Sequence, residues 1–285
     1  MESIPASVPA SAVCPKHPDQ PAVATCARCG TFICQTCSAS VNPPLCEACH
    51  ARRGIPLLHG PFTFGAAFVG SFRLFWPVIG NILAVAAILA VPIGLINHAM
   101  VVLKIESFLK LSLDLLIPGT IGLLGVIASM ALMNAQAMEQ PRTLGWALGE
   151  GFRAFARVFG AQFLAGLKIF LYLFLLVVPG IVKGVKLSMV APVAYLEDPV
   201  DAHERSESLV EGRGWEIFAL MLVATIIAAI VVMIPTAALG VARVKAPAIA
   251  PAVHVVVAFC SQVVSTWSWA VTLAAYYGLR NARPQ

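Results

Sequence analysis

The chain has 285 residues, of which 59% are hydrophobic and only 12% are charged, and its mean hydropathy is +0.85. An ordinary soluble domain is about 45–50% apolar and about 25% charged, so the composition excludes a simple soluble globular protein and disorder over most of the length. The formal net charge is +5. Seven of the eight cysteines lie between Cys14 and Cys49, which separates a cysteine-rich head from a long apolar body.

Residues 1–13 are predicted to form a disordered leader. Pro, Ser and Ala dominate them, and they have neither the positive nor the apolar region of a signal peptide. Without export, the head is expected to stay in a reducing cytosol, where clustered cysteines bind metal more often than they form disulfides. Residues 1–54 carry four Lys/Arg against three Asp/Glu. This balance gives no basic stripe, so no nucleic-acid partner is expected.

Four pairs of metal-ligating residues, each with two residues between its members, occupy positions 14–50. The pairs are Cys14 and His17, Cys26 and Cys29, Cys34 and Cys37, and Cys46 and Cys49. Zn²⁺ prefers thiolate and imidazole ligands, and a closed shell of four marks a structural site. So small a segment rarely folds by hydrophobic burial alone, so we expect two structural zinc ions to supply its folding free energy. The spacing does not decide whether neighbouring pairs share an ion (sequential ligation) or alternate pairs do (interleaved ligation).

The head resembles a B-box-type zinc finger. The resemblance lies in Cys14-x2-His17 and Cys26-x2-Cys29-x4-Cys34-x2-Cys37, with Phe32 and Ile33 before the third pair. The pattern departs from the family at the last pair, where histidines are usual and this chain has cysteines. The interleaved ligation of the family implies two sets of ligands: Cys14, His17, Cys34 and Cys37, then Cys26, Cys29, Cys46 and Cys49. The resemblance also implies a protein-interaction module, without identifying the protein partner.

The apolar body is predicted to be an all-α polytopic membrane helix bundle. Residues 51–62 form the expected linker, 63–280 the membrane domain and 281–285 a tail. A spanning helix needs about 20 predominantly apolar residues. Spans are expected at about 72–97, 113–137, 160–178, 181–196, 216–240 and 252–278.

The stretch 181–196 decides the number of spans. It has only 16 residues, follows Pro179 and Gly180, and carries Lys183 and Lys186. A turn at Pro179 gives six spans, with 12 Lys/Arg inside and 6 outside, these two lysines among the latter. One kinked helix over about 169–196 gives five spans, a similar charge ratio and two lysines within the membrane, at a considerable energetic cost. Six spans are therefore favoured, with the head in the cytosol and the body in the inner (cytoplasmic) membrane.

A partial internal repeat links two parts of the body. Seven residue pairs coincide at an offset of 80: Thr63/Thr143, Gly65/Gly145, Ala67/Ala147, Phe72/Phe152, Arg73/Arg153, Phe75/Phe155 and Gly80/Gly160. Each copy predicts an amphipathic helix leading into a span, and residues 202–215 before the span 216–240 form a weaker third copy. Repeats of this kind fit a bundle built by duplication, and they also occur in transporters.

The segment 178–215 carries a second resemblance. Its residues are Pro179-Gly180, Pro192, Glu197 and Ala202-x2-Arg205-Ser206-x2-Leu209-x2-Gly212-x2-Trp215. They are similar to a broad group of bacterial six-helix membrane domains, one of which is fused to some glycerophosphodiester phosphodiesterases. The resemblance covers about residues 62–280 and implies a fold but no established activity.

Two basic residues are candidate polar sites of the membrane domain. Lys168 lies about nine residues into the third span, and a charge inside the membrane is a functional hypothesis by default. Arg205 lies on a predicted surface helix, for which Asp198 is the expected cap and Pro199 the first residue. Asp201, four residues before Arg205, is the expected ion-pair partner. That pairing would make Arg205 architectural, with a ligand or lipid-headgroup site as the alternative.

The sequence contains no Gly-x-Ser-Gly, His-Glu-x-x-His or phosphate-binding glycine motif, so no enzyme is expected. The first hypothesis is an integral membrane protein of unknown activity whose cytosolic zinc module binds a protein. Its expected partners are zinc, membrane lipid and that protein. The alternative is a transporter, channel or lipid-handling protein regulated by the zinc head. Acidic residues are scarce in the spans, which weighs against a proton-coupled transporter.

Overall fold

A computed structural model describes residues 12–26, 30–41, 44–47, 62–104, 107–138, 142–197, 201–245 and 247–282. The chain divides into two compact units, Met1–Gly54 and Ile55–Gln285. Most of the predicted leader and linker, and residues 283–285 of the predicted tail, lie outside the described residues.

The first unit is built from three short antiparallel strand pairs. They are β1 (Val13–Cys14) with β2 (His17–Pro21), β3 (Ala24–Thr25) with β4 (Phe32–Ile33), and β5 (Ser38–Val41) with β6 (Pro44–Cys46). The buried cluster of this unit comprises Cys14, Cys26, Ile33, Cys34 and Cys37. Since all but one of these residues are cysteines, the described part of the head has almost no ordinary apolar core.

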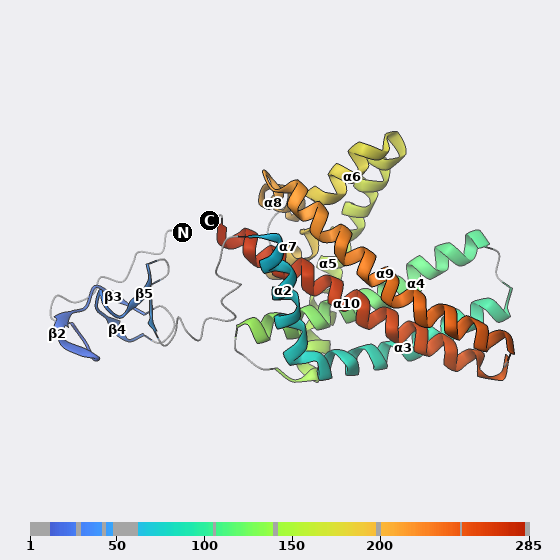
Figure 1. Ribbon diagram of the computed structural model, residues 1–285, viewed down its shortest axis with the longest axis horizontal. Helices are drawn as coiled ribbons and strands as arrows, with labels where there is room; N and C mark the ends of the chain where they lie inside the picture. Colours follow the sequence, from blue (N-terminus) through green and yellow to red (C-terminus); the bar gives the residue numbers. More distant parts are fainter. Residues whose placement is uncertain are drawn as a thin grey trace. The chain divides into compact units, whose positions relative to one another are not determined.

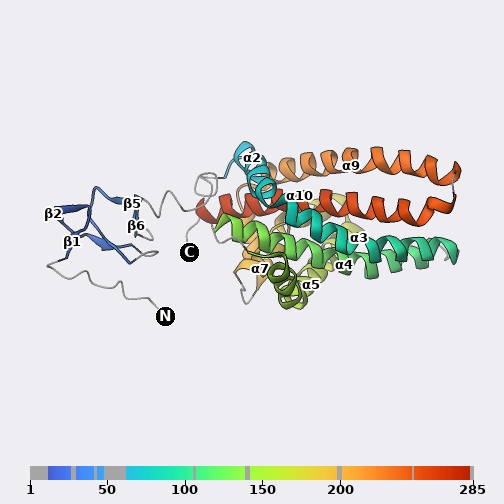
Figure 2. The same ribbon diagram turned by 90° about the horizontal axis from the view of Figure 1, so that it is seen from below.

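The second unit is a helical bundle. Its elements are α2 (Phe64–Phe75), η2 (Trp76–Val78), α3 (Ile79–Val102), α4 (Ser107–Ala137), α5 (Leu144–Leu175), α6 (Val177–Lys186), α7 (Val190–Leu196), α8 (Ala202–Val210), α9 (Gly214–Lys245), η3 (Pro247–Ile249) and α10 (Ala250–Ala282). Helix α10 packs against α2, α3, α4 and α9 and is the centre of the bundle (Figures 1 and 2).

Six stretches of the described body are long and apolar enough to cross a membrane. They are Phe64–Val102, Gly119–Ala137, Leu144–Leu175, Val177–Leu196, Gly214–Ile234 and Ala250–Asn281. The all-α polytopic fold class, preceded by a small cysteine-rich domain, is therefore confirmed. The chain forms three hairpins, in which α4 returns along α3, α6 along α5 and α10 along α9.

The chain reverses between α5 and α6. Leu176 has an extended backbone, with φ −159° and ψ 137°, and α6 starts at the next residue. Gly180 allows the two helices to meet closely, because a Cβ atom there would lie 2.7 Å from the Cα of Leu173. The single helix over 169–196 of the five-span alternative is therefore not formed.

Helix α8 packs against the junction of α6 and α7. The Ser206 hydroxyl donates to the carbonyl of Lys186 at 2.8 Å and accepts from the backbone N–H of Met189 at 3.2 Å. One side chain thus satisfies both ends of the break between these helices. The ammonium group of Lys183 contacts Glu207 Oε1 on α8 at 2.5 Å. The prediction that Lys183 and the helix of Arg205 lie on opposite sides of the membrane is therefore wrong.

The two main copies of the repeat have equivalent caps and buried faces. Thr63 Oγ1 accepts from the N–H of Ala66 at 3.2 Å, and Thr143 Oγ1 accepts from that of Trp146 at 3.3 Å. Equivalent residues are buried in both helices: Ala67, Ser71 and Leu74 in α2, and Ala147, Gly151 and Ala154 in α5. The copies differ after this point. Pro77 follows α2 and separates it from α3, whereas α5 has Arg157 at the equivalent position and continues unbroken.

Gly94 sets the closest approach of α3 to α10. A Cβ atom at Gly94 would lie 2.5 Å from the Cα of Val255, a contact that requires the backbone to shift. Gly94→Ala is therefore expected to reduce the free energy of unfolding by about 1–3 kcal/mol through overpacking. The change should appear as a lower melting temperature of the detergent-solubilised protein. Gly80→Ala on the same helix is the control, because no atom lies within 4 Å of its added Cβ. Equal melting temperatures for the two variants would contradict the close contact.

Candidate functional site

Four side chains of the head form a compact cluster of metal-ligating atoms. Cys14, His17, Cys34 and Cys37 each contribute one such atom, and all four atoms lie within 4.8 Å of one another. Nδ1 of His17 is 3.4 Å from Sγ of Cys34 and 3.2 Å from Sγ of Cys37, and the sulfurs of Cys14 and Cys37 are 3.7 Å apart. Three sulfurs and one imidazole nitrogen are a standard tetrahedral ligand set for Zn²⁺.

Two tight turns bring these ligands together. Cys14 and His17 face each other across the turn of the β1–β2 hairpin, where they are a register pair. Cys34 directly follows β4, and its carbonyl accepts from the N–H groups of Cys37 at 3.1 Å and Ser38 at 3.0 Å. The two-residue spacing therefore acts as the sequence predicts, with each turn presenting two ligands to one point.

The close packing of the cluster changes how readily its members ionise. Burial opposes ionisation of Cys14, but backbone N–H donors at Cys34, Lys16 and His17 lower its pKa to about 6. Burial and the neighbouring sulfurs instead raise the pKa of Cys37 to about 11. The hydrogen bond with Cys34 raises the pKa of His17. A bound dication would relieve the repulsion between the sulfurs and favour all three thiolates.

The cluster joins the first residue pair to the third, which is the interleaved arrangement. Sequential ligation would instead join Cys14 and His17 to Cys26 and Cys29. For the second ligand set, the structure shows the N–H of Cys46 donating to Sγ of Cys26 at 3.4 Å. Cys29 and Cys49 lie outside the described residues.

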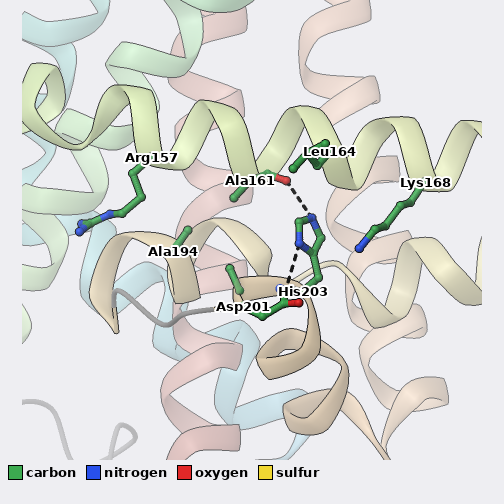
Figure 3. Close-up of a pocket in the computed structure, with 8 residues that line it drawn as sticks. Arg157, Ala161, Leu164, Lys168, Ala194, Asp201 and His203 are labelled. Atoms are coloured by element: carbon green, nitrogen blue, oxygen red, sulfur yellow. Dashed lines mark hydrogen bonds and ion pairs between the residues drawn. The ribbon is translucent and has the colours of Figure 1, made fainter.

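A second polar site lies in the body, between α5, α7 and α8 (Figure 3). Its cavity has a volume of about 380 Å³ and is lined by Arg157, Ala161, Leu164, Lys168, Ala194, Asp201, Ala202 and His203. The Lys168 side chain extends from α5 toward α8 (Figure 3). Of the two basic residues that the sequence singles out, Lys168 lines this pocket and Arg205 lies outside it.

The acidic residue of this pocket has a structural role. Asp201 is the N-cap of α8, and its Oδ1 accepts from the N–H groups of His203 at 2.8 Å and Glu204 at 3.2 Å. These two hydrogen bonds lower the pKa of Asp201, and Lys168 adds to the effect. The helix thus starts at Ala202, three residues after the expected first residue Pro199; Asp198 and Pro199 lie outside the described residues.

His203 links α8 to α5 across the pocket. Its side chain is buried, with Nε2 3.1 Å from the carbonyl oxygen of Ala161 and Nδ1 3.5 Å from Oδ1 of Asp201. Arg157 is fixed at the other end of the pocket, where its Nη2 donates to the carbonyl of Tyr195 at 3.1 Å. The sequence reasoning did not identify either residue, because only the packing of α8 on α5 brings them to one cavity.

Arg205 belongs to a buried ionic cluster away from the pocket. Its Nε lies 2.7 Å from Oε2 of Glu197, and the hydroxyl of Tyr276 on α10 donates to Oε1 of the same carboxylate at 2.8 Å. The Glu197 side chain is only 6% exposed. Burial opposes its ionisation, but the hydrogen bonds from Arg205 and Tyr276 prevail and lower its pKa. The predicted Asp201–Arg205 pair is therefore wrong, and Arg205 anchors α8 to the end of α7.

Comparison with known proteins identifies the head only. A family model described as the B-box zinc finger matches residues 9–43, which include the first three ligand pairs and exclude Cys46 and Cys49. No curated protein and no solved structure matches the chain. With the Cys14–His17–Cys34–Cys37 cluster, this match supports zinc binding by a B-box-like domain. The head and the six candidate spans together fit a multi-pass membrane protein with a zinc head.

Proposed function

We propose that this chain is a membrane-anchored adaptor, in which the zinc head recruits a protein partner and the helical body holds it at the membrane. The observation that carries the proposal is the set of three cysteines and one histidine in a module whose buried cluster, among the described residues, otherwise holds only cysteine and Ile33. A shell closed by four protein ligands leaves no position for water or substrate, which favours a structural zinc. The proposal therefore assigns no enzymatic activity to the head.

The proposal includes a second zinc ion, held by Cys26, Cys29, Cys46 and Cys49. Its support is the 3.4 Å contact between the N–H of Cys46 and Sγ of Cys26, which brings two of these ligand residues together. The exposed side chains of Val13 and Val23 support a protein partner, because they offer apolar surface on a small domain.

The proposal places the head in the cytosol and the body in the inner (cytoplasmic) membrane. An even number of spans leaves both ends of the body on one side, and the distribution of Lys and Arg favours the cytosol for that side. We further propose kinship of the body with the bacterial six-helix membrane domains. The support for this kinship is the motif between Pro179 and Trp215.

Crosslinking in native membranes tests the adaptor role. Proteins crosslinked to the wild-type chain would be identified and compared with those of a Cys34→Ser, Cys37→Ser double variant, which loses two of the four clustered ligands. A defined set of partners is expected to disappear from the double variant. Cys260→Ser, which makes the same exchange in α10, is the matched control and should keep the partners. Identical partner sets in all three proteins would contradict the proposal.

A further inference from the structure

The pocket between α5, α7 and α8 has an excess of positive charge. Arg157 and Lys168 contribute two cations and Asp201 one anion. The Asp201 carboxylate already accepts two backbone hydrogen bonds as the cap of α8. Among the described residues, the ammonium of Lys168 has no hydrogen-bond or ion-pair partner. Lys168 acts on Asp201 by electrostatic attraction alone, so the pocket offers an ammonium group that no described residue holds in a hydrogen bond or ion pair, next to the positive N-terminal end of α8.

Apolar surface of α5 continues directly from this pocket. Leu164, Lys168 and Leu171 follow one another at spacings of four and three residues, so they share one face of the helix. Leu164 also lines the pocket, and both leucines are exposed. A ligand that reaches Lys168 therefore meets polar groups on the side of α8 and an exposed apolar stripe on the side of Leu171.

The length of the pocket favours an extended ligand. Arg157 and Lys168 are eleven residues apart on α5, which separates their Cα atoms by about 16 Å along the helix axis. An inorganic phosphate ion is too small to use both ends of such a site. A phosphate-bearing headgroup with attached acyl chains fits the whole arrangement, because the chains can follow the apolar stripe.

We propose that this pocket binds the headgroup phosphate of an anionic phospholipid. Lys168 contacts the phosphate, the polar remainder of the headgroup extends toward the Arg157 end of the pocket, and the acyl chains lie along Leu164 and Leu171. The same arrangement accounts for a lysine within a spanning segment, since its ammonium group turns toward the pocket (Figure 3). This binding site is independent of the zinc head and of the partner that the head recruits.

Native mass spectrometry of the full-length protein tests the proposal, with phosphatidylglycerol as the probe. Lys168→Gln is expected to weaken binding by roughly tenfold, as for the loss of one charge-assisted contact. The matched control is Arg153→Gln, which removes a positive charge from the exposed part of α5 outside the pocket. Lys168→Arg keeps the charge and should bind nearly as tightly as the wild type. Equal binding by Lys168→Gln and Arg153→Gln would overturn the proposal.

Competition on the unaltered protein provides a test that does not depend on the folding of any variant. Unlabelled phosphatidylglycerol is expected to displace a fluorescent phosphatidylglycerol, whereas glycerol phosphate and phosphatidylcholine displace it weakly. Equal displacement by glycerol phosphate would show that the pocket binds soluble phosphate esters and would overturn the lipid assignment. Equal displacement by phosphatidylcholine would show that the positive charge does not select the ligand, which also overturns the proposal.

Discussion

Removing zinc is expected to unfold residues 14–50 while the helical body keeps its structure. Zinc binding contributes about 10–16 kcal/mol in finger peptides, and the buried cluster in the described part of the head contains only Ile33 besides cysteines. No comparable metal-ligand cluster occurs in the described part of the body. Hydrogen exchange of the full-length protein in a chelator titration measures both units at once. Amides of the head should lose protection as zinc leaves, and amides of the six candidate spans should keep it.

Zinc content and one pair of variants control this experiment. Elemental analysis should find two zinc ions per chain, and Cys34→Ser should lose zinc and head protection together because Cys34 belongs to the cluster. Cys260→Ser should retain both. A head that kept its protection in strong chelator, with less than one zinc ion per chain, would contradict the metal-dependent fold.

Breaking the Glu197 ion pair is expected to destabilise the body by about 1–3 kcal/mol, because Glu197→Ala leaves the partly buried Arg205 guanidinium without its carboxylate partner. The hydroxyl of Tyr276 would lose its acceptor in the same substitution. The melting temperature in detergent measures the effect. Glu204→Ala is the matched control, because it removes an exposed carboxylate from the first turn of α8. Similar melting temperatures for both variants would show that the buried pair does not stabilise the body.

The pH dependence of the free energy of unfolding measures how much the Glu197 carboxylate contributes to stability. The pKa of Glu197 is lower in the folded protein than its ordinary value of 4.5. Its ionised form therefore favours folding, so the contribution is fully present above pH 4.5 and is lost as the pH falls through the lowered folded value. Glu197→Gln should remove this part of the acid sensitivity, while the contribution of Asp201 remains. An unchanged acid limb in Glu197→Gln would exclude the pair as its source.

Local patterns in the sequence predicted the helices and four clustered zinc ligands, because both depend on neighbouring residues. Runs of about 20 apolar residues define spans whatever their packing, and a two-residue spacing defines a turn that presents two ligands. The partner of Arg205 was mispredicted for the opposite reason. The spacing of four favours Asp201, but the fold brings Glu197 and the distant Tyr276 to the guanidinium side of α8.

The residues of the pocket between α5, α7 and α8 could likewise be predicted only in part from local sequence patterns. Lys168 is noticeable in the sequence because it interrupts an apolar run, and the structure places it in a cavity. Arg157 and His203 have no such signal, since each belongs to a segment with other polar residues. Their proximity depends on the chain reversal after Leu175 and on the return of α8 along α5, which arise from tertiary packing.

One position distinguishes the two main copies of the repeat in both backbone and charge. Pro77 and Arg157 are equivalent at the offset of 80. In the first copy the proline falls in the 3-10 turn η2 between α2 and α3, whereas in the second copy the arginine lies on the wall of the cavity. The two copies therefore differ at this single position both in the course of the backbone and in the charge that they present.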